Sequence, residues 1–168
     1  MEKKFLFWTI VFSAILIISS YFLISKISSN QNQKVNIVYY KQSDLAKPKV
    51  KVKQFEKDIG TIKVSDEKSA DFLIKNTGQK PLQLFNISSS CGCTVGKVII
   101  DGKESEEFGM HSRSSYVGEV LPGKEAVVRV IYRPYVMPVY GAVIREVYVS
   151  TNDPENEKLV FKIKTFVK

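Results

Sequence analysis

Alternating hydrophobic and polar residues are the dominant pattern of the chain after about residue 50. The clearest stretches, in which every second residue is apolar, are Ala70 to Ile74, Ala126 to Tyr132 and Leu159 to Ile163. A period of two places alternate side chains on opposite faces of a strand, so that one face enters a core and the other meets water. The pattern therefore predicts a β-strand in each of these stretches.

Further strands are predicted from the density of β-branched and aromatic residues, which favour strands. Such residues are dense at Leu82 to Ile87, Val95 to Ile100 and Val143 to Val149. From Lys49 to Lys53, lysines alternate with valines, which is typical of an edge strand protected by charge. Nothing after residue 26 has a sustained apolar period of a helix, so the folded part is expected to be nearly all strand.

Turn signals separate these segments. Gly tolerates positive φ, Asn and Asp bond to nearby backbone, and Pro fixes φ. The candidate structural turn residues are Asn76, Gly78, Gly123, Asn152, Asp153 and Pro154. About seven short strands at this spacing predict an all-β, immunoglobulin-like β-sandwich, a closed barrel being the alternative arrangement.

The first 26 residues differ in composition from the rest, because no charge lies between Lys4 and Lys26. Residues 5–25 supply the ~20 apolar residues that a transmembrane helix needs. A cleaved signal peptide is the alternative, but its apolar region is usually shorter. We therefore expect an N-terminal signal anchor that spans the membrane once, with the rest of the chain extracytoplasmic, in the periplasm or on the cell surface.

A polar stretch follows the expected anchor. Residues 28–33 read Ser-Ser-Asn-Gln-Asn-Gln, and such a segment cannot bury enough apolar surface to fold alone. The expected organisation is therefore an anchor over residues 1–26, a polar linker over residues 27–49 and a β-sandwich over residues 50–168.

The net charge of +8 changes this picture little. Basic residues cluster from Lys34 to Lys57, where they could attract anionic lipid head groups. The strand-like alternation of the lysines favours a solvated linker and a guarded edge strand instead. No aromatic platform is interleaved with the basic residues, so nucleic-acid binding is not expected.

Cys91 and Cys93 are the only cysteines and flank Gly92. Three interpretations stay open: a disulfide, thiolate ligands for Cu(I) or Zn(II) with His111, Met110 and Met137 as possible completing ligands, and small buried hydrophobic residues. So small a ring constrains little chain entropy, so a bond here suits redox chemistry better than a stabilising clamp. The donors are too few to assign a metal site, and no cofactor is assigned, copper being the one considered.

His111 is the only histidine, so a Ser/His/Asp or Cys/His hydrolase would depend on it. It lies among serines in a long polar stretch, Asp101 to Gly118, where an exposed loop histidine is the simpler interpretation. No catalytic residue is assigned and enzymatic activity is not expected. Thiol redox activity at Cys91 and Cys93 is the one enzymatic alternative.

An ordered set of motifs carries a family resemblance: Asn76-Thr77-Gly78, Ser90-Cys91-Gly92-Cys93-Thr94, Pro122-Gly123 and Thr151-Asn152-Asp153-Pro154. The set resembles a bacterial immunoglobulin-like domain family of unknown function, similar to Hydin-type domains. The resemblance covers roughly Phe55 to Val167, and Asp58 to Ile62 looks like the family's first strand. It implies an exported, membrane- or lipid-anchored domain. The stretch from Lys97 to Glu119 is largely an insertion relative to this family.

Two functions follow as expectations. The first is a membrane-tethered interaction or structural module without catalysis, which presents an edge strand or end loops to another protein of the cell envelope. The second is a thiol-redox or copper-handling protein that uses the Cys91 and Cys93 pair.

Overall fold

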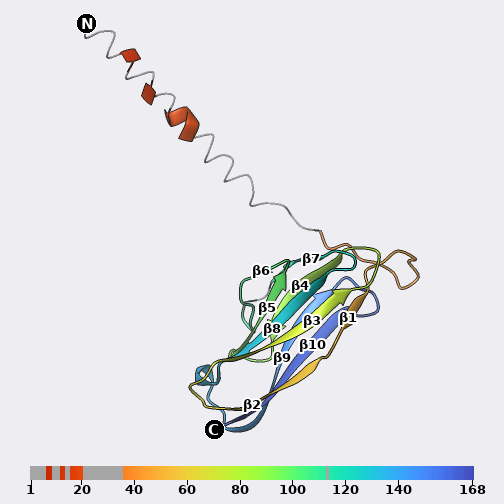
Figure 1. Ribbon diagram of the computed structural model, residues 1–168, viewed down its shortest axis with the longest axis vertical. Helices are drawn as coiled ribbons and strands as arrows, with labels where there is room; N and C mark the ends of the chain where they lie inside the picture. The colour runs from red at the N-terminus through yellow and green to blue at the C-terminus, as the bar shows by residue number, and fades with distance from the viewer. Residues whose placement is uncertain (1–6, 9–11, 14–15, 21–35, 113) are drawn as a thin grey trace. The chain divides into compact units, whose positions relative to one another are not determined.

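The computed structural model of the protein describes residues 7–8, 12–13, 16–20, 36–112 and 114–168. The chain divides into two compact units, Met1–Asn36 and Ile37–Lys168. The described residues before residue 21 are helical (Figure 1). The expected anchor at residues 5–25 lies largely outside the described residues. Within the part of the chain that is described, no helix has the length and apolar character required to cross a membrane.

The second unit consists of two five-stranded sheets (Figure 1). The strand order is β1-β3-β8-β5-β6 in sheet A and β2-β10-β9-β4-β7 in sheet B. The strands are β1 (Val50–Val52), β2 (Glu56–Ile62), β3 (Lys68–Asn76), β4 (Leu82–Ser89), β5 (Thr94–Ile100), β6 (Lys103–Glu104), β7 (Gly118–Val120), β8 (Glu125–Tyr132), β9 (Gly141–Thr151) and β10 (Lys158–Val167). A 3₁₀ turn, η1 (Pro134–Val136), precedes β9.

The all-β prediction is confirmed, and each predicted segment lies in a strand or, for Lys49 to Lys53, contains one. The described part of the chain has ten strands, not about seven. The additional strands are β2, β6 and β7. Of these, β2 contains the Asp58 to Ile62 segment that the family resemblance indicated. β6 lies within the polar stretch from Asp101 to Gly118, and β7 begins at the last residue of that stretch. The lysine-rich strand β1 lies at an edge of sheet A, as predicted.

The core lies between the two sheets because alternate residues of each strand point inward. In β3 every second residue from Ala70 onward is buried. Phe72 of sheet A and Phe161 of sheet B are both fully buried, and their ring centroids are 5.1 Å apart. Burying a side chain of this size contributes about 1.5–3 kcal/mol. The sandwich therefore has a core of its own.

The compact unit begins at Ile37, not at Val50. Residues 37–49, expected to be part of a polar linker, lie against the sandwich through backbone hydrogen bonds. The Val38 N–H donates to Gln83 Oε1 at 2.7 Å, and the carbonyl oxygens of Lys47 and Lys49 accept N–H groups from the β3–β4 turn. Pro48 is buried. Linker residues 27–35 lie outside the described residues.

The predicted turn residues lie at this same end of the sandwich, which we call the N-terminal end. Asn152 Oδ1 accepts the Gln83 N–H at 2.8 Å, and Asp153 Oδ2 accepts the Val50 N–H at 2.9 Å. Gly123 adopts a positive φ of 78° in the β7–β8 turn. The opposite end, which we call the distal end, carries the β2–β3, β4–β5 and β8–β9 connections (Figure 1).

Candidate functional site: a disulfide loop beside an arginine and an apolar surface

Cys91 and Cys93 form a disulfide in the β4–β5 connection at the distal end. Their Cα atoms are 5.3 Å apart, within the range usual for disulfides. The loop is held by its backbone: the Thr94 N–H donates to the Cys91 carbonyl at 3.3 Å, and the Arg133 N–H donates to the Cys93 carbonyl at 2.8 Å. Of the three sequence interpretations, the structure contains the disulfide.

The two sulfur-bearing residues differ in exposure. Cys93 is 1% exposed and belongs to the hydrophobic core, whereas Cys91 is only half-buried and Gly92 is exposed. Thr94 Oγ1 lies 3.3 Å from Cys91 Sγ and 3.8 Å from Cys93 Sγ. Solvent and solutes therefore have better access to the Cys91 side of the bond.

Arg145 of β9 contacts the buried sulfur. Its Nε donates a hydrogen bond to Cys93 Sγ at 3.3 Å, and its guanidinium lies 5.4 Å from the centroid of the Tyr132 ring. Such stacking holds a guanidinium in place by cation–π attraction. The Tyr132 hydroxyl itself is buried without a hydrogen-bond partner among the described residues. Arg145 was not a candidate in the sequence analysis, yet it is the charged group bonded to the disulfide.

The other two described arginines are paired with carboxylates. Arg129 bonds to Asp71 at 2.7 Å and to Glu104 at 3.1 Å. Arg133 makes two bonds with Glu107, at 2.7 and 2.9 Å, and one with Glu67. The described residues contain no ion pair of Arg145. Its charge therefore faces a sulfur atom instead of a carboxylate.

An exposed apolar surface borders the disulfide loop. It is formed by the β8–β9 connection, which includes η1, and we call it the 135–140 surface. A Cβ atom built on Gly92 would lie 3.9 Å from Met137 Sδ. The exposed fractions of its large side chains are 49% for Tyr135, 49% for Val136, 51% for Met137, 42% for Val139 and 70% for Tyr140.

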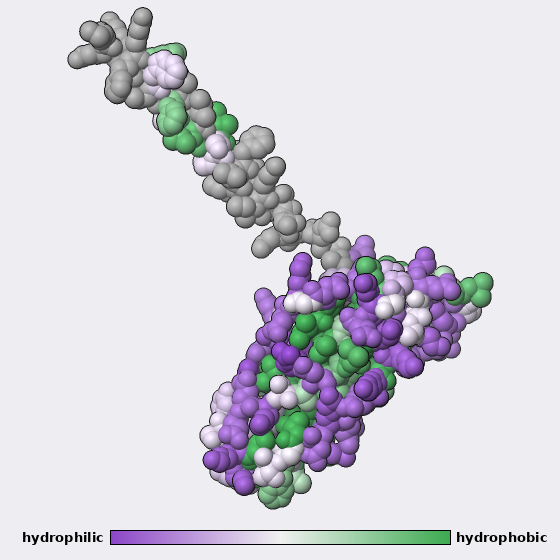
Figure 2. All heavy atoms as spheres, in the orientation of Figure 1, coloured by the Kyte–Doolittle hydropathy of each residue, from purple (hydrophilic) through white to green (hydrophobic). Residues whose placement is uncertain are grey.

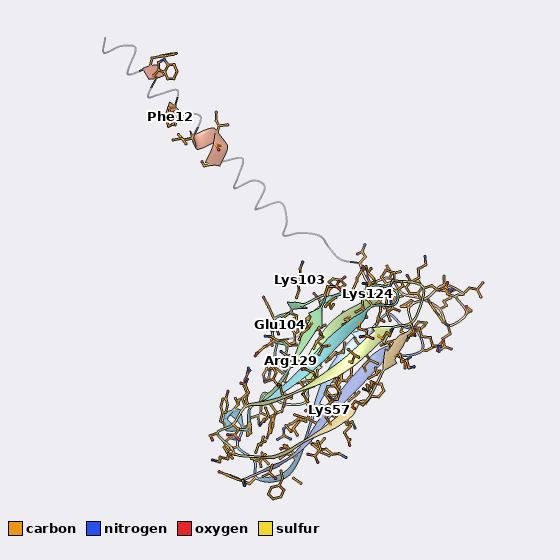
Figure 3. All side chains as sticks on the ribbon, viewed as in Figure 1. Phe12, Lys57, Lys103, Glu104, Lys124 and Arg129 are labelled. Carbon is orange, nitrogen blue, oxygen red and sulfur yellow. A yellow bond between two sulfur atoms is a disulfide. The ribbon has the colours of Figure 1, made fainter. Side chains whose placement is uncertain are left out.

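Ion pairs hold the inserted stretch between β5 and β7 to sheet A. Glu104 pairs with Lys97 at 2.9 Å and with Arg129, its neighbour in Figure 3. The hydrogen bond and charge of Lys97 lower the pKa of Glu104. In the same way, the hydrogen bonds from Arg133 lower the pKa of Glu107. The insertion is therefore anchored at both carboxylates.

His111 is exposed near the tip of this insertion. Among the described residues, no group of three or more His, Cys, Asp and Glu side chains is arranged to hold a metal ion. The candidate set Cys91, Cys93 and His111 is therefore not brought together as ligands. The disulfide also engages both sulfur atoms, whereas metal ligation by cysteine requires thiolates.

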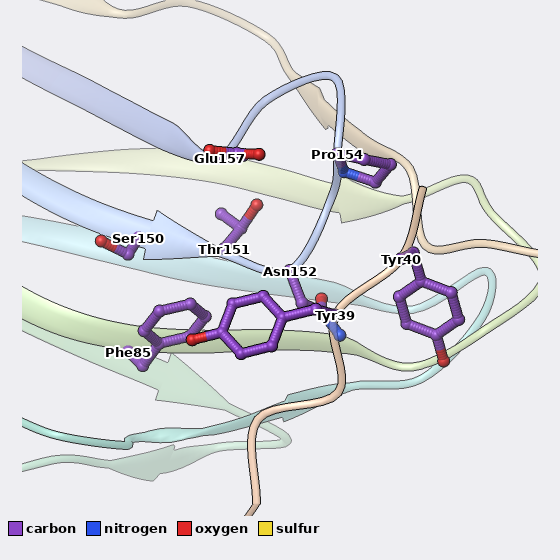
Figure 4. A pocket seen from close by; sticks show the side chains of 8 residues that line it. All are labelled: Tyr39, Tyr40, Phe85, Ser150, Thr151, Asn152, Pro154 and Glu157. Carbon is purple, nitrogen blue, oxygen red and sulfur yellow. The ribbon is translucent and has the colours of Figure 1, made fainter. Parts of the chain in front are cut away.

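A cavity of about 180 Å³ lies at the N-terminal end (Figure 4). Tyr39 and Tyr40 of the N-terminal segment line it together with Phe85, Asn152 and residues of the β9–β10 turn. The Asn152 side-chain amide already donates to Pro81 O and to Gln83 Oε1, each at 3.3 Å. The cavity is thus formed where residues 37–40 pack on sheet B, and the side-chain amide of Asn152 already makes its hydrogen bonds within the fold.

On the face seen in Figure 2, hydrophobic residues are visible between polar side chains along the sandwich. In sheet A, Leu73, Val127 and Ile99 are cross-strand partners. The row beside them holds Asp71, Arg129 and Lys97. The outer face of this sheet therefore alternates apolar and charged rows.

These features define a two-sheet β-sandwich domain with a disulfide loop at one end. Residues 50–107 match a family model described as a protein of unknown function (DUF1573). No curated protein matches the sequence.

Solved structures resemble this chain at low sequence identity. A protein of unknown function from Porphyromonas gingivalis W83 is 18% identical, with a TM-score of 0.54 over 72% of this chain and 47% of that protein. The chain thus spans about half of that protein's length. A PapD-like domain of human CEP192 is 13% identical over 82% of this chain and 97% of that one, with a TM-score of 0.48. At 18% identity the likeness to the Porphyromonas gingivalis protein concerns the fold alone.

Proposed function

We propose that this protein is a membrane-tethered, extracytoplasmic immunoglobulin-like module that binds another protein of the bacterial cell envelope through its distal end. The observation that supports this function best is the 135–140 surface. It exposes a continuous run of large apolar side chains next to a well-packed sandwich.

The composition of this surface suits a protein partner. Contiguous exposed apolar residues on a soluble domain mark interaction sites more often than isolated ones do. Tyr and Met are enriched at protein interfaces, where Tyr supplies a large amphipathic contact and Met adapts to irregular surfaces. Tyr135, Met137 and Tyr140 are each about half exposed or more. A heterologous protein surface is therefore the proposed occupant.

The position of the surface suits a tethered domain. The 135–140 surface precedes Gly141, the first residue of β9, whereas Thr151 at the other end of β9 lies beside the N-terminal end. An extended strand of 11 residues spans about 36 Å at ~3.3 Å per residue. The 135–140 surface and the N-terminal end of the sandwich, where Ile37 enters it, are therefore at opposite ends of β9.

The compartment is inferred from the disulfide and the sequence. Disulfides persist in oxidising compartments and are rare in the bacterial cytoplasm. The apolar composition of residues 5–25 and the resemblance to exported Hydin-type domains point to the same location. A reporter enzyme active only outside the cytoplasm, fused after Lys168, should therefore be active. A fusion that is active only with a cytoplasmic reporter would overturn this location.

Site-specific photo-crosslinking in intact cells tests the binding surface. A photoreactive phenylalanine analogue in place of Tyr140 should give one discrete adduct. The control is the same analogue at Leu45, which is 99% exposed but lies in the N-terminal segment, and it should give none. In the variant that carries the analogue at position 140, Met137→Asp should lower the adduct yield at least roughly tenfold, because burying an unpaired charge in an apolar interface is costly.

The mass of the adduct distinguishes a heterologous protein partner from a second copy of this chain. An adduct of twice the 19.1 kDa chain mass would identify a second copy and reject the heterologous partner. Equal adducts at both positions, or an adduct that Met137→Asp leaves unchanged, would reject the 135–140 surface as the binding site.

A further inference from the structure

We propose that the Cys91–Cys93 disulfide is an exchange-active redox site that oxidises a protein dithiol, with Cys91 Sγ as the sulfur that is attacked and Cys93 Sγ as the leaving group. Arg145 is a positioning residue that stabilises the leaving thiolate. The inference goes beyond the proposed binding function and does not depend on the 135–140 surface.

Access selects the attacked sulfur. Thiol–disulfide exchange requires an incoming thiolate to reach one sulfur of the bond. Cys93 is 1% exposed and packed in the core, whereas Cys91 is half-buried and is followed by the exposed Gly92. The incoming thiolate therefore attacks Cys91 Sγ, and the bond breaks toward Cys93.

Charge favours Cys93 as the leaving group. A disulfide sulfur is only a weak hydrogen-bond acceptor, so the hydrogen bond from Arg145 to the neutral disulfide contributes little. A thiolate accepts a stronger, charge-assisted hydrogen bond. Arg145 Nε is already 3.3 Å from Cys93 Sγ, so the charge that develops on that sulfur meets a cation in place. A better-stabilised leaving thiolate leaves faster.

The surroundings leave the charge of Arg145 available. The nearest acid along the strand, Glu146, is engaged elsewhere: it accepts the Tyr148 hydroxyl at 2.7 Å and pairs with Lys162 at 3.0 Å. The Arg145 guanidinium is fixed by the Tyr132 ring and by a bond to the Ile144 carbonyl at 3.0 Å. By contrast, Arg129 and Arg133 are neutralised by carboxylates.

The loop is suited to opening and closing. The cysteines are separated by one residue, so the bond restrains the unfolded chain far less than one that closes a long loop. Backbone hydrogen bonds to the Cys91 and Cys93 carbonyls hold the loop independently of the sulfur–sulfur bond. Both thiols would therefore stay close together after reduction.

The reaction transfers two electrons from the dithiol. One thiolate of the dithiol attacks Cys91 Sγ, the Cys91–Cys93 bond breaks, and its electron pair goes to Cys93 Sγ. The second thiolate of the dithiol then attacks its own partner sulfur in the mixed disulfide, and Cys91 Sγ takes the electron pair of that bond. The dithiol becomes a disulfide, and its two protons are transferred to the Cys91 and Cys93 thiolates.

The test uses the oxidised full-length chain and dithiothreitol, a small dithiol that needs no docking surface. Reduction is followed by trapping the released thiols. Wild type should be reduced at least about tenfold faster than Arg145→Gln, and Arg145→Lys should recover part of the rate. The matched control is Arg129→Gln, which removes the same charge from a paired arginine on the other sheet and should leave the rate unchanged. Equal rates for wild type and Arg145→Gln would overturn the proposal.

Single-cysteine variants test which sulfur reacts. With oxidised glutathione, Cys93→Ser should form a mixed disulfide at Cys91 at least roughly tenfold faster than Cys91→Ser forms one at Cys93. The reverse order would overturn the assignment.

A second measurement applies if circular dichroism shows that Arg145→Gln does not fold. It is the pH dependence of Cys93 alkylation in Arg145→Lys, which should shift to higher pH because the hydrogen bond from the guanidinium is lost. An unshifted profile would reject the role of Arg145. Because dithiothreitol does not require the 135–140 surface, these outcomes are independent of the crosslinking result.

Discussion

At the residue scale, Asn76 joins segments that are far apart in the chain. It is fully buried. Its Nδ2 donates to Lys80 O and to Val120 O, each at 2.8 Å, while its Oδ1 accepts the N–H groups of Gly78 at 2.9 Å and Lys49 at 3.4 Å. Its side chain thus satisfies backbone groups that would otherwise be buried without partners.

We predict that Asn76→Ala lowers the free energy of unfolding by about 3 kcal/mol, because each buried group left unpaired costs ~1–3 kcal/mol. Urea unfolding of residues 37–168, which contain a core of their own, measures the change. The control is Thr77→Ala, which removes one exposed bond to Lys49 O and should cost about 0.5 kcal/mol. Similar losses of unfolding free energy for both variants would show that the burial of Asn76 is not the reason that its side chain stabilises the fold.

Local sequence identifies such residues only in part. The Asn-Thr-Gly motif indicated a turn at Asn76, but not its bond to Val120, 44 residues away. Arg145 illustrates the same limit, since 52 residues separate it from Cys93. One signal could have identified it: Arg145 interrupts an alternate apolar series formed by Val143, Val147 and Val149. A charged residue at a strand position that faces the core requires a buried partner. That partner can be identified only from the fold.

At the scale of elements, the attachment of β1 depends on Gly78. A Cβ at this position would lie 2.4 Å from Lys47 O and 2.4 Å from Lys49 N, and both of these are backbone atoms. We predict that Gly78→Ala displaces residues 47–49 and detaches β1 from β3, which should raise hydrogen exchange across residues 37–53 at least about tenfold.

Gly109→Ala is the control for this change. A Cβ there would meet only ordinary contacts, the nearest at 3.4 Å from Val95, so exchange in β1 should not change. Unaltered exchange in Gly78→Ala would mean that the close approach of the two backbones is not required to hold the segment.

The inserted elements show why strand counts from alternation are too low. β5 and β6 form a hairpin in which Ile100 pairs with Lys103. The residues between them, Asp101 and Gly102, have φ values of 49° and 77°, which suits the two-residue hairpin turn that Asp-Gly sequences favour. The sequence contained this turn signal, but β6 has only two residues and cannot show a period. β7, with three residues, was missed for the same reason.

The pairing of Glu107 with Arg133 should make anchoring of the insertion depend on pH. The hydrogen bonds from Arg133 lower the pKa of Glu107 from its ordinary value of 4.5 in the folded state. A carboxylate with a lowered pKa stabilises the fold above its unfolded pKa and loses that contribution as the pH falls through its folded pKa. The loss should therefore occur below about pH 4.5.

Glu107→Gln tests this dependence. At about pH 7 the variant should be less stable than wild type by ~0.5–1 kcal/mol, a range appropriate to partly exposed ion pairs. The difference should be smaller near pH 3, because that pH lies below the ordinary pKa of 4.5 and the carboxylate of Glu107 loses charge as the pH falls. Urea midpoints at both pH values measure it, with Glu106→Gln, an exposed neighbour, as the control. A difference that is just as large at low pH would show that packing, not charge, is lost in Glu107→Gln.

At the scale of the whole molecule, alternation predicted the sandwich but not its N-terminal boundary. Residues 37–49 contain no regular period, and much of their contribution is made through backbone groups such as the Val38 N–H and the Lys49 carbonyl. A backbone donor or acceptor carries no side-chain signature, so composition alone assigned these residues to a linker. The compact unit is therefore longer at its N-terminus than the hydrophobic pattern indicated.

The disulfide provides a test of what holds the whole sandwich together. Closing a loop of about three residues stabilises a fold by only ~1.5 kcal/mol in the chain-entropy model, against ~4.7 kcal/mol for a loop of about 100 residues. We therefore predict that the Cys91→Ser, Cys93→Ser double variant, and wild type reduced with dithiothreitol, each unfold in urea with a loss near this smaller value. Both oxidation states would then share one fold, which a site that cycles between them requires. Cooperative unfolding on reduction would instead make the bond a structural clamp, because the core between the two sheets would then depend on it.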